Sequence, residues 1–224
     1  MGIFTAPNAW QPSDFELYLP YRVRSAQAIA RLWRHPSLSG PYGRCDVELD
    51  QQPIVAVDDE PQSNPYHLHG VVRLGDGKRV PCRSSYLVPD EDAPNCELSL
   101  AIPLGSLARA YTVQGSPYGE ANSPEVDRWM RMVEETLMEI AQFVFAEHPF
   151  NYAAIGFEVV LPPEPPDEPV DNFWDTILIP DSDGLRVHWR TTPTGQTQPQ
   201  AGVPVSNQRP NISRAESVRK LIGD

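Results

Sequence analysis

The sequence has few lysines and no long apolar run. Only Lys78 and Lys220 are lysines among its 18 basic residues, and 30 acidic residues outnumber these to give a formal net charge of −12. Proteins that bind a nucleic-acid backbone gather basic residues on one surface, so this balance excludes nucleic acid as a partner class. No apolar run approaches the roughly 18 residues that a membrane span requires, so we expect no membrane partner either.

Cysteine is also scarce. Cys45, Cys82 and Cys96 are odd in number and do not have the spacing of metal ligands, and the chain begins without a charged and apolar leader. These features are typical of proteins from a reducing compartment. We therefore expect a cytoplasmic protein with reduced thiols, although the sequence leaves open a disulfide between two of the three.

Proline, by contrast, is abundant, with 25 among 224 residues, which is about twice its usual share. Long helices must therefore be scarce, because proline interrupts them. A hydrophobic content of 40% is nevertheless ordinary for a globular protein. The length favours one domain with an appendage.

Alternating apolar and polar residues predict a series of strands that polar, glycine and proline breakers separate. Gly75-Asp76-Gly77 is the clearest turn, because Asp-Gly tolerates the positive φ of a tight hairpin. The series predicts an antiparallel meander. Its expected strands span residues 15–23, 44–49, 53–57, 66–74, 78–88, 95–102 and 152–161.

Helical patterns occupy three segments. Residues 26–34 have apolar side chains at helical spacing after a candidate cap, Ser25, and residues 104–111 predict one or two turns. The strongest pattern covers residues 124–147, where Ser123 is a natural N-cap and Pro124 suits the first position. One stripe comprises Val126, Met130, Val133, Leu137, Ile140 and Val144. The expected fold class is α+β, with an antiparallel meander sheet packed against one long amphipathic helix.

The composition changes at residue 162, where an extended proline-rich segment begins. We therefore divide the chain into an α+β core domain, 1–161, which we expect to fold alone, and a C-terminal segment, 162–224. This segment combines a proline-rich linker, a β-hairpin and a short basic C-terminal helix that starts near Asn211 or Ser213. The hairpin is expected from strands at 175–180 and 185–191, and residues 192–210 are expected to lack regular structure.

His67 and His69 are the most suggestive metal-ligand pair, because alternate residues of a strand share a face. A third ligand would have to come from Cys82 on the predicted partner strand, or from Asp58 and Glu60. The favoured interpretation is simpler: the apolar residues of this strand face the core while both histidines and Arg73 face solvent. We expect no cofactor.

Cys82 lies between Arg79 and Arg83, which could lower the pKa of its thiol. A small core residue is the favoured interpretation, because no catalytic base is indicated nearby.

The C-terminal third is more informative, since extended prolines, acidic residues and a tryptophan-bearing hairpin suit a segment that lies across another surface. Residues 45–62 and 152–185 contain acidic residues and no basic ones, which favours a basic protein partner. The candidate partner-binding residues are Trp174, Trp189, Asp171, Asp175, Asp58, Asp59 and Glu60.

The leading functional hypothesis is a non-enzymatic protein that acts through protein contacts, as an inhibitor or immunity-type binder, an adaptor or an assembly subunit. One alternative is a metal-dependent enzyme that uses His67 and His69. Another is a self-assembling structural protein whose tails exchange between subunits, so that an oligomer is possible.

Overall fold

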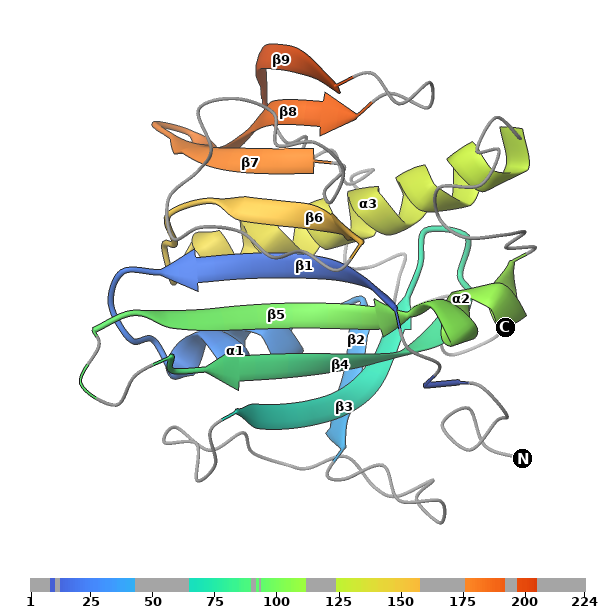
Figure 1. Ribbon diagram of the computed structural model, residues 1–224, viewed down its shortest axis with the longest axis horizontal. Helices are drawn as coiled ribbons and strands as arrows, with labels where there is room; N and C mark the ends of the chain where they lie inside the picture. The colour runs from blue at the N-terminus through green and yellow to red at the C-terminus, as the bar shows by residue number, and fades with distance from the viewer. Residues whose placement is uncertain are drawn as a thin grey trace, which may run out of the picture.

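The computed structural model describes residues 9–10, 13–42, 65–89, 92, 94–111, 124–157, 176–191 and 197–204. Within these ranges the chain forms one antiparallel sheet and three helices (Figure 1). The strands are β1 (Asp14–Tyr21), β2 (Leu38–Tyr42), β3 (Tyr66–Arg73), β4 (Arg79–Leu87), β5 (Cys96–Pro103), β6 (Ala153–Phe157), β7 (Thr176–Asp181), β8 (Gly184–Thr191) and β9 (Thr197–Pro204). The helices are α1 (Gln27–Trp33), α2 (Leu104–Ala110) and α3 (Pro124–Phe145). The α+β class expected from the sequence is confirmed.

The strand order is β2-β3-β4-β5-β1-β6-β7-β8-β9, so the sheet is not one continuous meander. β1 lies between two meanders, pairing with β5 through Leu17↔Leu100 and with β6 through Leu17↔Ile155. Seven of its eight residues are buried, as a strand flanked on both sides and covered on its faces requires. The first strand of the chain is therefore the centre of the fold.

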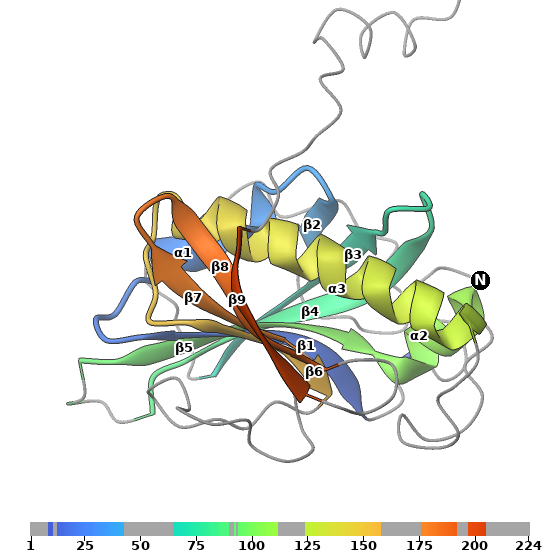
Figure 2. The same ribbon diagram turned by 90° about the horizontal axis from the view of Figure 1, so that it is seen from above.

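α1 and α3 cover one face of the sheet (Figure 2). Alternate residues of β1 point to this face, because side chains along a strand alternate between faces. They join the buried residues of α3 in one core. Its members include Phe15, Leu17, Leu19, Ile29, Leu32, Leu68, Leu98, Leu100, Val133, Leu137, Ile140 and Val144. No helix in the described ranges is long and apolar enough to cross a membrane.

The hairpin β7–β8 extends the sheet beyond β6, and Leu178, Leu185 and Val187 belong to the same core. Polar contacts join this hairpin to α3. The hydroxyl of Thr176 donates a hydrogen bond to the buried carboxylate of Glu134, and the Leu185 N–H donates to Gln142 Oε1 at 2.9 Å. The hairpin is therefore built into the core that the first 157 residues form.

Two strands lie where the sequence predicts none. β2 contains Gly40-Pro41, and its pairing with β3 is irregular between Ser39 and Tyr42. β9 lies within residues 192–210, which were expected to lack regular structure. Both are the outermost strands among those that the structure describes, and proline is tolerated at such positions because one side of the strand needs no ladder partner. The expected strands at 44–49 and 53–57, and the C-terminal helix, lie outside the described residues.

Ser25 does not cap α1, contrary to the sequence-based expectation. The N-cap residue is Ala26, without a side-chain hydrogen bond, and Ser25 Oγ lies 3.2 Å from Nδ1 of His148 instead. Its hydroxyl thus joins the start of α1 to the segment that follows α3.

Candidate functional site

The face of the sheet opposite α1 and α3, termed here the second face, carries the polar residues of β1, β3, β4 and β5. At its centre Tyr18 and Tyr152 lie with ring centroids 6.4 Å apart and planes inclined by 54°. Ala154 and Ile177 complete a small buried cluster with these rings, separate from the helix-covered core. The two tyrosines come from β1 and from the residue before β6, which β1–β6 pairing brings together.

Glu97 of β5 lies beside this aromatic pair. The Tyr18 hydroxyl hydrogen-bonds to its carboxylate. Burial, and secondly the Glu97 charge, raise the pKa of Tyr18 and of Tyr152 above the ordinary tyrosine value. Both phenols therefore remain protonated and can donate to the carboxylate or to a bound acceptor.

A cavity of about 110 Å³ opens beside Glu97, where β1 ends and β5 begins. Its polar lining residues have a carboxylate, two phenols, two side-chain amides and one guanidinium. The polar lining residues are Tyr18, Tyr21, Arg22, Asn95, Glu97 and Asn151. The volume is smaller than the engineered cavity of about 150 Å³ that holds benzene, so it suits one small group. Glu97 provides negative charge next to the two tyrosine rings.

The two histidines share the second face, as strand alternation predicts. His67 pairs with Ser85 and His69 with Arg83, while Leu68 and Val72 point to the helix-covered core. The His69 ring contacts Trp10 edge to face, with centroids 5.1 Å apart. Desolvation, and secondly the nearby Arg83, lower the pKa of His67. The Arg83 cation would repel a metal ion at this place.

Cys82, one of the third metal ligands suggested by the sequence, is not available on this face. Cys82 pairs with Gly70, is 0% exposed and belongs to the helix-covered core, so its thiol lies on the other side of the sheet from both histidines. Arg79 and Arg83 are at alternating positions of β4 and face away from this thiol. Asp58 and Glu60 lie outside the described residues, and within those residues no three potential ligands cluster.

Most predicted partner-binding residues lie outside the described part of the chain, namely Asp58, Asp59, Glu60, Asp171, Trp174 and Asp175. Trp189 is within β8, where its backbone pairs with Ile177 of β7. Ile177 belongs to the cluster around Tyr18 and Tyr152. The predicted tryptophan position is thus next to the aromatic cluster in the sheet register.

Sequence reasoning did not single out Tyr18, Glu97 or Tyr152. Each residue alone is an ordinary polar position in a predicted strand, and long-range pairing through β1 brings them together. The sequence does show that Tyr18 and Glu97 alternate with the core residues of their strands, so both are expected on the opposite face of the sheet. This alternation predicts the face on which each side chain lies, but it does not predict which side chains lie next to it.

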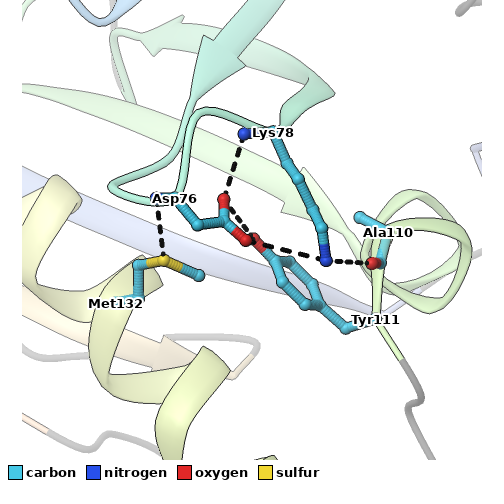
Figure 3. A network of polar contacts seen from close by, with 5 residues as sticks. All are labelled: Asp76, Lys78, Ala110, Tyr111 and Met132. Carbon is cyan, nitrogen blue, oxygen red and sulfur yellow. Dashed lines mark hydrogen bonds and ion pairs between the residues drawn. The ribbon is translucent and has the colours of Figure 1, made fainter.

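A second polar cluster joins the β3–β4 turn to α2 and α3 (Figure 3). Tyr111 donates from its hydroxyl to both Asp76 carboxylate oxygens at 3.1 Å, and Lys78 Nζ donates to the Ala110 carbonyl at 2.7 Å. The Lys78 ammonium also lies 3.9 Å from the centroid of the Tyr111 ring, and the Asp76 N–H approaches Met132 Sδ at 3.2 Å. These contacts hold the hairpin turn in place and occupy its charges.

This cluster predicts a measurable acid dependence. Partial burial alone would raise the pKa of Asp76, but hydrogen bonds from the Lys78 N–H and the Tyr111 hydroxyl, with the Lys78 charge, outweigh it and lower the pKa below the usual 3.8. The carboxylate therefore stabilises the fold above pH 3.8. This contribution is lost as the pH falls through the lowered pKa that Asp76 has in the folded state.

We expect Asp76→Asn to reduce the free energy of unfolding at neutral pH by about 0.5 kcal/mol, discounted for solvent screening because the residue is exposed. The dependence of that energy on pH should become shallower below pH 3.8. Urea unfolding between pH 2 and 7 measures this. Asp183→Asn, in the exposed turn between β7 and β8, is the matched control and should leave the acid slope unchanged; equal slopes for wild type and Asp76→Asn would contradict the assignment.

Comparisons of the chain with protein-family models, with curated proteins and with solved structures found no match.

Proposed function

We propose that this protein works by contact with another protein rather than by catalysis, and that a basic side chain of the partner enters the cavity beside Glu97. The observation that carries the proposal is the Glu97 carboxylate at a cavity of about 110 Å³, next to Tyr18 and Tyr152. Carboxylates and aromatic faces are the two groups with which proteins hold ammonium and guanidinium ions. A cavity of this size accepts the end of one side chain.

Long-range electrostatics support the same partner. A formal net charge of −12 attracts a basic protein and accelerates its approach. Arg22 also lines the cavity, but this residue is exposed, so its charge is well screened by water. Glu97 is half-buried and is hydrogen-bonded by Tyr18, so its charge is held in one position.

The proposal retains the finer features that the sequence predicts. The proline-rich stretch that begins at residue 162, the acidic residues Asp58, Asp59, Glu60, Asp171 and Asp175, and Trp174 and Trp189 would add to the contact around the cavity. A cytoplasmic inhibitor, adaptor or assembly subunit would each use such a surface. The long amphipathic helix serves in this proposal as the support behind the sheet.

The test uses small probes of the two side chains and their neutral counterpart. Nα-acetyl-lysine methylamide and the arginine analogue are titrated into the ¹⁵N-labelled full chain, with the norleucine analogue as the neutral control. We expect saturable shifts of the Glu97, Asn95 and Tyr18 amide signals with at least one basic probe and none with norleucine. Glu97→Gln should weaken that binding at least tenfold, because it removes the only charge of the ion pair on this side.

Glu135→Gln, which removes an exposed carboxylate from α3, is the matched control and should bind like the wild type. Glutamine can still accept the Tyr18 hydrogen bond, so both variants should keep the wild-type free energy of unfolding to within about 1 kcal/mol. The proposal is wrong if both basic probes leave the cavity signals unchanged, or if they bind Glu97→Gln as tightly as the wild type.

A further inference from the structure

Two arginines face each other across the β3–β4 ribbon on the second face. Arg73 pairs directly with Arg79 in the antiparallel register. The Leu74 N–H donates to the Lys78 carbonyl at 2.9 Å and closes the turn, so the next rung, Arg73/Arg79, is a non-hydrogen-bonded pair. In such pairs the Cα atoms are about 4.5 Å apart and the side chains are closest. The two guanidinium groups therefore leave the sheet side by side.

Neighbouring charges are already engaged elsewhere. Lys78 binds the Ala110 carbonyl and Asp76, the Asp76 carboxylate accepts from Tyr111, and Arg83 pairs with Asp14. Both arginines of the rung are exposed, and in the described part of the chain neither guanidinium group makes a hydrogen bond or an ion pair. Like charges directly opposite each other destabilise a sheet. The rung therefore has two unused donor groups whose mutual repulsion an anion would relieve.

We propose that the Arg73/Arg79 rung binds carboxylates of an acidic protein segment. Each guanidinium presents a planar set of N–H donors that matches a carboxylate in two-point geometry. Two adjacent carboxylates neutralise the rung, and both arginines are exposed at the turn end of the strand pair, where such a segment can reach them. A nucleic acid fits less well, because its backbone is bound through many phosphate contacts, whereas the rung presents two adjacent cations.

This inference goes beyond the proposed function, because it concerns another part of the second face and the opposite charge. The Glu97 cavity lies where β1 and β5 meet, whereas the arginine rung lies beside the β3–β4 turn. A partner that carries both basic and acidic groups could use the two sites together. Either site can nevertheless exist without the other, so their tests are separate.

The experiment titrates the full chain with an acetylated and amidated tetraglutamate peptide at low salt, following the arginine Nε–H signals by NMR. We expect selective shifts of the Arg73 and Arg79 signals that weaken as salt is added. Arg79→Gln should reduce the affinity at least tenfold. Without peptide, the same variant should raise Tm by about 1–2 °C, because it removes the repulsion across the rung.

Arg34→Gln, at an exposed arginine after α1, is the matched control. It should leave the affinity for the peptide unchanged and should not raise Tm. A tetraglutamine peptide should not bind. The inference fails if the tetraglutamate peptide leaves both signals unchanged, if it binds Arg79→Gln as tightly as the wild type, or if inorganic phosphate or single-stranded DNA binds more tightly than the peptide. Binding of the basic probes beside Glu97 should be the same in Arg79→Gln, which separates failure here from failure of the proposed function.

Discussion

Removal of residues 163–224 is expected to leave a chain that no longer folds cooperatively. The deletion takes away β7 and β8, and with them Leu178, Leu185 and Val187 of the core. Full burial of one aliphatic side chain contributes roughly 1.5–3 kcal/mol, so these three contribute about 5–9 kcal/mol together. The whole stability of an ordinary domain is about 5–15 kcal/mol.

Two further losses add to this deficit. β6 becomes an edge strand whose Ala153–Phe157 backbone loses its partner, and the buried Glu134 carboxylate loses the hydrogen bond from Thr176. A hydrogen bond to a charged group contributes about 1.5–3 kcal/mol. An assay that deletes the C-terminal segment to test binding would therefore remove the fold together with the tail.

Near-ultraviolet circular dichroism and urea unfolding measure the effect. The matched control is a chain that ends at residue 204, which retains all nine strands of the described sheet. This control should unfold in a single transition, whereas the chain that ends at residue 162 should show no cooperative transition. A native-like spectrum and a sharp urea midpoint for the shorter chain would support the sequence-based expectation that residues 1–161 are a self-contained domain.

Local patterns in the sequence were sufficient for the fold class. Strand alternation identifies β3, β4 and β5, because the residues that face the core recur at every second position. Gly75-Asp76-Gly77 correctly predicts the turn between β3 and β4. Gly77 has φ +85°, a conformation that glycine adopts without strain. These predictions need only information from neighbouring residues, which the sequence contains.

Strand order could not be predicted in the same way. β1 precedes every other strand, yet it pairs with β5 and β6, whose positions along the chain give no local cue. β2 and β9 contain proline, and their strand conformation depends on the backbone groups of a neighbouring strand. Tertiary pairing here overrides the turn and linker propensities of these segments.

In the candidate sites, too, the sequence predicts the face of a residue but not its neighbours. Alternation correctly placed His67 and His69 on one face, but it could not show that Arg83 and Trp10 lie beside them or that Cys82 faces the other way. The arginine rung depends on which residue of β4 faces Arg73, which is fixed by the three-residue turn between the strands. The Glu97 cavity depends on pairing across β1. A single sequence contains the residues of a site but not their distances.

Gly70→Ala is expected to destabilise the protein by about 3 kcal/mol, at the upper end of the cost of overpacking. A Cβ at this position would lie 2.2 Å and 2.4 Å from two ring atoms of Trp33 and 2.7 Å from the Ser39 carbonyl oxygen. The indole ring has little freedom to move away. Its Nε1–H donates to Ser84 Oγ at 2.9 Å in a buried position, and the ring also lies against Gly40.

Thermal and urea unfolding of Gly70→Ala, Gly75→Ala, Trp33→Leu and the double variant of Gly70 and Trp33 separate this clash from other effects of alanine. Gly75→Ala is the control: its Cβ would meet only the flexible Met132 side chain, at 3.3 Å, so its cost should stay below about 1 kcal/mol. In a Trp33→Leu background the cost of Gly70→Ala should fall to about 1 kcal/mol, because the ring is gone and only the Ser39 carbonyl contact remains. Additive effects of Gly70→Ala and Trp33→Leu would mean that the indole does not press on Gly70. Because Trp33 belongs to α1 and Gly70 to β3, strong coupling between the two would show that this glycine sets how closely the helix approaches the sheet.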